Sequence, residues 1–179
     1  AETEFCSRVE AFLETHCNRI GENQEMVGEE DADVIARMKT FQGSLAEAGL
    51  AALSYPAEFG GAGLTKRHQE LFDHASKGWH LPNSALSISH GMCLPMLSQF
   101  GTDAQKSLFM PDCISGATIW CQLFSEPGAG SDVAGLATRA TRDGDQWILN
   151  GQKVWTSGAH YADYGLIVAR TDPALPNII

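Results

Sequence analysis

The stretch CQLFSEPGAGSDVAG, residues 121–135, marks the place where the chain changes from helical to β-strand periodicity. Its first residues complete an apolar run that ends at Phe124, and such a run favours a strand. Three glycines, two serines and one proline follow within the same stretch, and this composition is typical of a turn. The turn could bind a phosphate, bind another ligand, or only end the strand.

Two phosphate-binding patterns do not fit this turn. A P-loop needs a lysine and then Ser or Thr after its last glycine, whereas Gly130 is followed by Ser131 and Asp132. A dinucleotide-binding turn needs a third glycine where this chain has Val133. Two alternatives remain: backbone N–H groups and serine hydroxyls that donate to an anion or a heterocycle, or a turn that only closes a strand. Glu126 and Asp132 are candidates to brace the loop.

Upstream of about Gly116 the apolar residues follow a helical period. The clearest predicted helix has an acidic start at Asp31 and Asp33 and ends at Gly49. The preceding acidic stretch, residues 21–33, is expected to be a solvated connection between helices. One face of the helix is apolar and carries Val34, Ile35, Met38, Phe41, Leu45 and Ala48.

Further helices are predicted before the change of period. Thr65 can cap a helix that ends near Gly78, and Thr102 with Gln105 has the pattern of a capping box. Between them, residues 81–101 predict a closely packed helix that is kinked or broken at Pro95. Its larger apolar side chains could be core residues or walls of a ligand pocket, namely Leu86, Met92, Leu94 and Met96.

Downstream of Gly116 the pattern is that of short strands, so the chain is predicted to be α+β, with helices first and a small sheet after them. The Asn-Gly pair is the strongest hairpin signal in this part. The expected elements are a strand within 118–124, three short strands within 140–158 turned at Asp143-Gly144 and Asn150-Gly151, and a strand within 164–171.

Composition excludes several classes of protein. The net charge is −10 with no basic cluster, which argues against a nucleic-acid partner. We expect no membrane span and no secretory signal, hence a soluble protein, and the scattered cysteines indicate a reducing cytoplasm. The five cysteines and six histidines lack metal-ligand spacing, so no metal site and no disulfide framework is expected.

Four stretches of the chain resemble the acyl-CoA dehydrogenase family, in the order in which the family shows them. They are YPAEFGGAGL (55–64), GTDAQKSLFMPDCISG (101–116), SEPGAGSD (125–132) and NGQKVWTSG (150–158). The resemblance implies an amino-terminal all-helical domain over residues 1–116. It further implies an incomplete antiparallel β-barrel-like domain over residues 117–179, with the family's carboxy-terminal helical bundle absent from this sequence.

The resemblance also implies that FAD lies against the β domain, with an acyl-CoA substrate between flavin and helices. Ser125 and Ser157 match hydroxyls that face the flavin ring, Trp155 matches an aromatic residue packed on it, and Ser131 matches a contact to the CoA arm of the substrate. Gln122 stands where many members have an aromatic residue. The full set of expected cofactor-binding residues is Gln122, Leu123, Phe124, Ser125, Gly130, Ser131, Trp155, Thr156 and Ser157.

For function, the resemblance implies FAD-dependent α,β-dehydrogenation of an acyl-CoA thioester, with an electron-transfer flavoprotein as acceptor and a homo- or hetero-oligomeric enzyme. The family's catalytic glutamate comes from the bundle, so we assign no catalytic residue and expect these 179 residues to be inactive alone. Glu126 and Asp132 are expected to be structural. The alternatives are a flavin oxidase or monooxygenase on the same scaffold, and a non-catalytic subunit.

Overall fold

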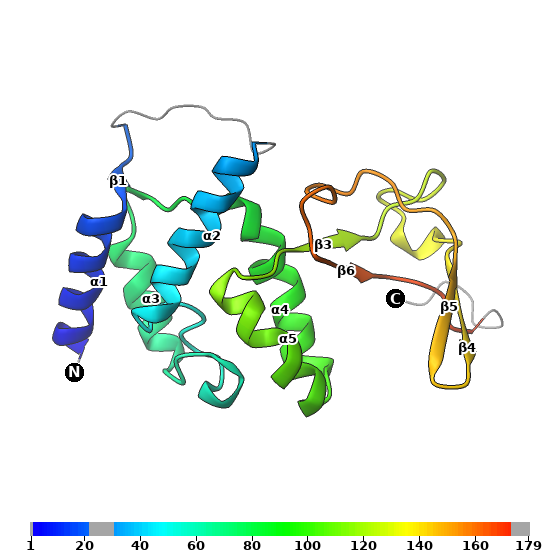
Figure 1. Ribbon diagram of the computed structural model, residues 1–179, viewed down its shortest axis with the longest axis horizontal. Helices are drawn as coiled ribbons and strands as arrows, with labels where there is room; N and C mark the ends of the chain where they lie inside the picture. The colour runs from blue at the N-terminus through cyan, green and yellow to red at the C-terminus, as the bar shows by residue number, and fades with distance from the viewer. Residues whose placement is uncertain (1, 22–30, 173–179) are drawn as a thin grey trace. The chain divides into compact units, whose positions relative to one another are not determined.

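The computed structural model describes residues 2–21 and 31–172, and the chain divides into two compact units. The first unit runs to Ile119 and is helical, and the second begins at Trp120 and contains short strands (Figure 1). The predicted α+β class, helices first and small sheets after, is therefore confirmed. The domain division expected after Gly116 stays a prediction, and most of the acidic stretch 21–33 lies outside the described residues.

Five α-helices account for most of the described helical unit. Helix α1 packs against α3, while α2 and α4 pack against α5. The largest fully buried side chains of this unit include Leu13, Leu53, Leu86 and Met110. The helices are α1 (Glu2–His16), α2 (Ala32–Glu47), α3 (Lys66–Ala75), α4 (Leu94–Phe100) and α5 (Asp103–Ser115). Two short strands, β1 (Asn18–Arg19) and β2 (Trp79–His80), pair antiparallel beside them.

Helix α2 forms where its apolar period predicted a helix. The Asp31 carboxylate accepts a hydrogen bond from the Asp33 N–H at 2.8 Å and so caps the first turn. The helix ends two residues before Gly49, whose φ of +66° is the left-handed conformation that favours glycine. Its predicted face is buried at Val34, Ile35, Met38, Phe41 and Leu45, while Ala48 is half-buried.

The predicted capping box of α5 is present. The Thr102 hydroxyl accepts from the Gln105 N–H at 3.2 Å, and the Gln105 side chain accepts from the Thr102 N–H at 2.8 Å. Thr65 occupies the N-cap position of α3, but its side chain makes no capping bond to the backbone. It contacts the His68 ring nitrogen Nδ1 at 2.9 Å instead.

The helical segment around Pro95 is irregular, but the irregularity precedes Pro95 and no break occurs at the proline itself, since Cys93 and Leu94 keep helical backbone angles. A 3-10 turn (Ser84–Leu86) and a π-helical turn (Ser89–Cys93) precede α4, and Pro95 lies in the first turn of α4, where its missing N–H costs little. Of the candidate pocket walls, Leu86 and Leu94 are core residues, with 0% and 2% of their surface exposed, whereas Met96 is exposed.

The second unit contains two separate strand pairs. Strand β3 (Trp120–Leu123) pairs with β6 (Tyr164–Ile167), and β4 (Arg139–Asp143) pairs with β5 (Gln146–Asn150). The β4–β5 pair is the antiparallel hairpin predicted at Asp143-Gly144. The β3–β6 pair is parallel, a departure from the antiparallel arrangement expected throughout this domain.

The third strand predicted after Asn150-Gly151 is wrong. Beyond Gly151 the chain leaves the hairpin, and the Val154 N–H donates to the Ser125 carbonyl at 2.9 Å. At the departure point Gly151 lies so close to Thr138 that an added Cβ would be 2.7 Å from the Thr138 Cα. This close approach suits glycine and redirects the backbone, so the Asn-Gly pair here does not close a hairpin.

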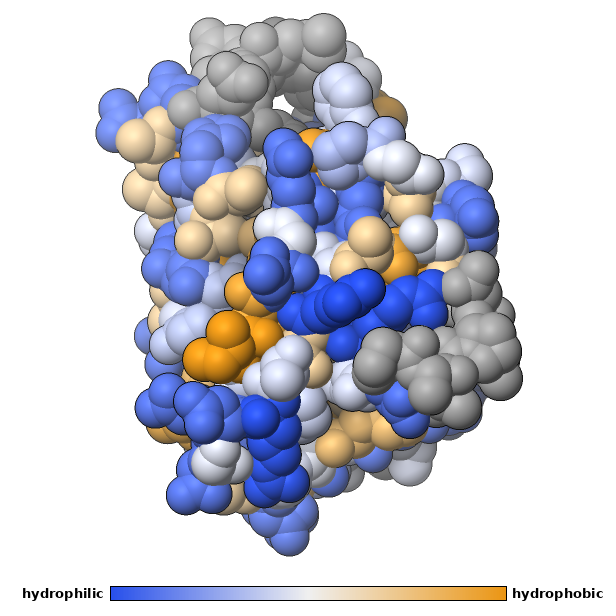
Figure 2. Space-filling view, turned by 90° about the vertical axis from the view of Figure 1, so that its right-hand side faces the viewer, coloured by the Kyte–Doolittle hydropathy of each residue, from blue (hydrophilic) through white to orange (hydrophobic). Residues whose placement is uncertain are grey.

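The hairpin itself is open to solvent on both faces. Only Ala140 among its strand residues is buried, and Trp147, Ile148 and Leu149 are each about half exposed. Figure 2 shows hydrophobic side chains gathered in a patch beside hydrophilic ones on the face that it draws.

Replacing Thr102 by Ala should lower the free energy of unfolding of the helical unit by about 1 kcal/mol, because one N–H at the start of α5 loses its acceptor. Thr65→Ala is the matched control, since Thr65 occupies the same position of α3 without capping a backbone group. Urea unfolding followed by circular dichroism measures both changes. Equal losses in the two variants would contradict the capping role of Thr102.

Candidate functional site

The glycine turn that follows β3 is closed by its own backbone. The Glu126 N–H donates to the Ala129 carbonyl at 2.9 Å, and the Ala129 N–H donates to the Glu126 carbonyl at 3.1 Å. Further along, Asp132 Oδ1 accepts from the Gly135 N–H at 3.2 Å and caps one 3-10 turn (Val133–Gly135). Asp132 therefore braces the loop, as predicted.

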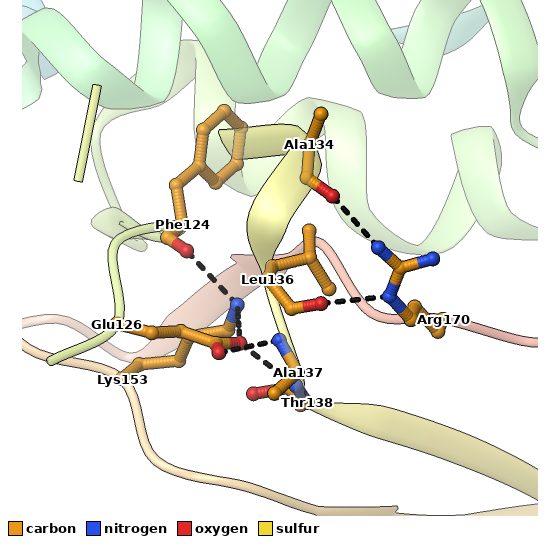
Figure 3. Close-up of polar contacts among 8 residues, drawn as sticks. All are labelled: Phe124, Glu126, Ala134, Leu136, Ala137, Thr138, Lys153 and Arg170. Atoms are coloured by element: carbon orange, nitrogen blue, oxygen red, sulfur yellow. Dashed lines mark hydrogen bonds and ion pairs between the residues drawn. The ribbon is translucent and has the colours of Figure 1, made fainter. Parts of the chain in front are cut away.

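Glu126 braces the loop more strongly, from a buried position (Figure 3). Its carboxylate accepts from the Ala137 N–H at 2.6 Å and from the Thr138 N–H at 2.9 Å. Lys153 completes the arrangement with its Nζ 2.9 Å from Glu126 Oε1, and each of these two side chains is only 7% exposed. The carboxylate thus joins three segments that are distant in sequence.

The surroundings of Glu126 keep it ionised. Burial alone raises the pKa of this carboxyl. The hydrogen bonds from Lys153 and from the Ala137 and Thr138 backbone lower the pKa by more than burial raises it, so that it falls to about 2. A general base works best with a pKa near the working pH. The pKa of Glu126 is far below that range, and both of its carboxylate oxygens accept hydrogen bonds. Both facts support the structural role expected for this residue.

Lys153 and Val154 place two expected site segments side by side. The Lys153 ammonium donates to the Phe124 carbonyl at 2.9 Å as well as to Glu126, and the next residue, Val154, donates to the Ser125 carbonyl. Residues 122–125 and 155–157 are therefore neighbours at this point. Lys153 was not among the residues predicted for the site, although it lies inside the quoted stretch NGQKVWTSG.

Arg170 is a second residue that the sequence did not indicate. Its Nε donates to the Leu136 carbonyl and its Nη2 to the Ala134 carbonyl, each at 2.7 Å (Figure 3). Its own backbone pairs with residues 138 and 140, which ties the hairpin to the chain beyond β6. Arg170 thus holds in place residues 134–138, the segment that leads from the glycine turn into the hairpin.

The expected cofactor-binding residues occupy two different places. Gln122 and Leu123 lie on β3, and Phe124 and Ser125 follow directly, all half-buried. Residues 155–157 lie beside them through the bonds of Lys153 and Val154. Gly130 and Ser131 are exposed on the turn, and no hydrogen bond among the described residues links them to the other segments.

Trp155 is held in an unusual state for a large aromatic residue. Its φ is +58°, a left-handed conformation that is uncommon for a non-glycine residue, and 88% of its surface is exposed. A strained backbone that presents an indole to solvent is typical of a residue whose contact is made with a ligand or partner.

The polar groups nearby suit a flat heterocycle with a polar edge. Within the described part of the chain, the hydroxyls of Ser125 and Ser157 form no hydrogen bond and are available as donors. The Gln122 side-chain oxygen is buried and has no hydrogen-bond partner in the same part of the chain. The segments that carry the indole and these two hydroxyls are neighbours, so the three groups are candidates to contact one ring system.

Two pockets, one in each unit, are lined by other residues. One of about 550 Å³ in the second unit borders Pro127, Arg139, Asn150 and Gln152, and includes none of the expected cofactor-binding residues. Another of about 260 Å³ lies within the helical unit and is bordered in part by Leu94. In residues 2–21 and 31–172 no helix is long and apolar enough to cross a membrane, and no cluster of three potential ligands could hold a metal ion.

Acid should weaken the second unit through Glu126. Since folding lowers the pKa of this carboxyl from 4.5 to about 2, its contribution is complete above pH 4.5 and is lost as the pH falls towards 2. Urea midpoints measured from pH 7 to pH 2 should fall over this window. Glu126→Gln should flatten the profile, whereas Asp132→Asn, an exposed acid of the same loop, should leave it steep. An unchanged slope in Glu126→Gln would contradict this role.

Comparisons with known proteins match the two parts of the chain to two domains of one family. Residues 1–117 match the family described as "Acyl-CoA dehydrogenase, N-terminal domain", and residues 121–177 match "Acyl-CoA dehydrogenase, middle domain". Acyl-CoA dehydrogenase IpdE1 of Mycobacterium tuberculosis (strain ATCC 25618 / H37Rv) is 44% identical over 128 residues, which are 72% of this chain and 33% of that protein. Acyl-CoA dehydrogenase FadE34 of the same organism is 44% identical over 135 residues, 75% of this chain and 19% of that protein.

Solved structures show the same likeness. The "Tcur3481-Tcur3483 steroid ACAD" superimposes with a TM-score of 0.72 at 30% identity, over 99% of this chain and 45% of that chain. The ChsE4-ChsE5 complex from Mycobacterium tuberculosis gives a TM-score of 0.70 at 30% identity, over 96% of this chain and 43% of that chain. The chain thus spans a third or less of the two curated relatives and under half of these solved chains. On the matches to both domains, the chain belongs to the acyl-CoA dehydrogenase family.

Proposed function

We propose that the chain forms the flavin-facing part of an enzyme that removes hydrogen from Cα and Cβ of an acyl-CoA thioester. The observation that carries this proposal is the exposed, strained Trp155 beside the available donors of Ser125 and Ser157. FAD, when bound, supplies the acceptor for the β-hydride. The residues of the chain bind the flavin, orient it and keep water from one side of it.

Each expected residue has a role in that arrangement. The Trp155 indole covers one face of the flavin ring, and the hydroxyls of Ser125 and Ser157 donate to its polar edge. Neutral donors in a partly buried site stabilise negative charge that develops on the ring, at no cost of reorganisation. The remaining residues border the ring or its phosphates through backbone and side-chain contacts, namely Gln122, Leu123, Phe124, Gly130 and Thr156.

Ser131 is proposed to contact the substrate and not only the cofactor. Ser131 is exposed on the glycine turn, and hydrogen bonds of Asp132 and Glu126 hold this loop in place. Its hydroxyl therefore has a defined position and stays available to a ligand. A hydroxyl in that state can bind the amide-rich arm of coenzyme A. We assign no catalytic base, because Glu126 and Asp132 both have structural partners.

A second candidate function is a non-catalytic subunit of a two-chain enzyme. The names of two solved relatives favour this function, because each of these names gives two different chains. A hetero-oligomeric partner is proposed on the same ground, with an electron-transfer flavoprotein as the acceptor of electrons. Flavin content of the purified gene product separates the two functions, because a colourless protein that takes up no FAD would support the subunit. Since one of these relatives is called a steroid ACAD, steroid acyl-CoA thioesters belong in the substrate panel.

Ser157→Ala should weaken FAD retention in the full gene product. The variant removes a neutral donor to the ring, which is worth about 0.5 to 1.5 kcal/mol. Equilibrium dialysis with absorbance of bound flavin measures the change. Thr141→Ala is the matched control, because it removes an exposed hydroxyl on β4. A Ser157 variant that keeps its full flavin content and its full rate of flavin reduction would refute this role.

Ser131→Ala should raise the KM for acyl-CoA by a few-fold to about tenfold, which corresponds to the loss of one neutral hydrogen bond. Flavin content should stay unchanged, because the proposed partner of this hydroxyl is the substrate. Steady-state kinetics with flavin quantified in the same sample test both statements. Loss of flavin with an unchanged KM would move Ser131 from the substrate to the cofactor.

A further inference from the structure

The Lys153 ammonium contacts the peptide bond that leads into Ser125. Its Nζ lies 2.9 Å from the Phe124 carbonyl oxygen and 2.9 Å from Glu126 Oε1, and the side chain is 7% exposed (Figure 3). Glu126 neutralises the ammonium, so the pair exerts little charge at long range. What Lys153 exerts locally is a charge-assisted hydrogen bond on one carbonyl.

That hydrogen bond changes the other end of the same peptide. The Phe124 carbonyl and the Ser125 N–H share one delocalised amide, and a donor on the oxygen withdraws electron density from the nitrogen. Hydrogen bonds in such a chain polarise one another, so the Ser125 N–H becomes a stronger donor. Among the described residues no acceptor is found for this N–H, while the Ser125 carbonyl is already used by Val154.

We propose that Lys153 is a positioning residue that raises the reduction potential of the bound flavin by acting through the Phe124–Ser125 peptide. The proposal rests on the proposed function, in which Ser125 faces the flavin ring. A stronger N–H donor stabilises the more negatively charged, reduced form of the ring over the oxidised form. Since Lys153 also holds residues 153–157 beside residues 124–125, the donor and the indole of Trp155 keep their places together.

Removing Lys153 alone would leave a buried carboxylate without its cation, so the test uses paired variants. Glu126→Gln with Lys153→Met removes the charge pair and the donor to Phe124. Glu126→Gln with Lys153→Gln also removes the charge pair but keeps a neutral amide donor at residue 153, and Lys153→Arg keeps a cationic donor. All are made in the full gene product loaded with FAD, with circular dichroism to establish folding.

The measurement is the midpoint potential of the flavin, by equilibration with reference dyes. In the variant with Lys153→Met, the flavin should bind in its reduced form about tenfold more weakly, relative to the oxidised form, than in the natural protein, a drop of about 30 mV for a two-electron couple. The variant with Lys153→Gln should show a smaller drop, because an amide is a neutral donor, and Lys153→Arg should stay near the natural protein. If the variant with Lys153→Met does not fold, the drop in the variant with Lys153→Gln is the test.

Two failures can be told apart. A natural protein that binds no FAD would overturn the proposed function itself. A natural protein that binds FAD, with the same potential in the variants with Lys153→Met and Lys153→Gln as in the natural protein, would overturn the role of Lys153 and leave the proposed function intact. A potential that falls equally in these two variants would also overturn it, because only one of them lacks a donor at residue 153.

Discussion

The second unit depends on one buried ion pair, between Glu126 and Lys153. The carboxylate accepts two backbone N–H groups beyond the glycine turn, and the ammonium reaches back to the Phe124 carbonyl ahead of it. The two side chains thereby join three segments: the end of β3 with the glycine turn, the start of the hairpin at residues 137–138, and the segment that carries Lys153. Removing either partner would leave a buried charge unsatisfied, which costs about 3 to 5 kcal/mol.

A pair of apolar side chains could fill the same space, and such replacements are often neutral or stabilising. Apolar contacts are not directional, however, and the turn here must present its backbone and serines in a defined arrangement. Hydrogen bonds from Glu126, Lys153 and Arg170 end mostly on backbone groups, so they fix where the chain runs and not only how closely it packs. A loop held in this way can leave its tip, with Ser131, free for a ligand.

Local patterns predicted the helical unit well, because its helices are specified by neighbouring residues. The apolar face and start of α2 and the capping box of α5 are properties of single segments. Prediction failed where distant segments decided the outcome. Gly151 packs against Thr138, so the Asn-Gly pair opens no third strand, and the parallel pairing of β3 with β6 joins residues far apart in the chain. The roles of Lys153 and Arg170 were invisible because their acceptors include backbone carbonyls, which no sequence pattern marks.

Trp155 shows how the rigid and the available parts of the site are related. A left-handed residue with an exposed indole is costly for the fold, of order 1 to 3 kcal/mol, and persists only where its surroundings determine it. Those surroundings are the bonds from Lys153 and Val154 to Phe124 and Ser125, immediately before the strained residue. These hydrogen bonds fix the backbone on the N-terminal side of Trp155 and so hold a conformation that the segment alone would rarely adopt. The result is a rigid backbone that presents a large, exposed indole, with 88% of the Trp155 surface open to solvent.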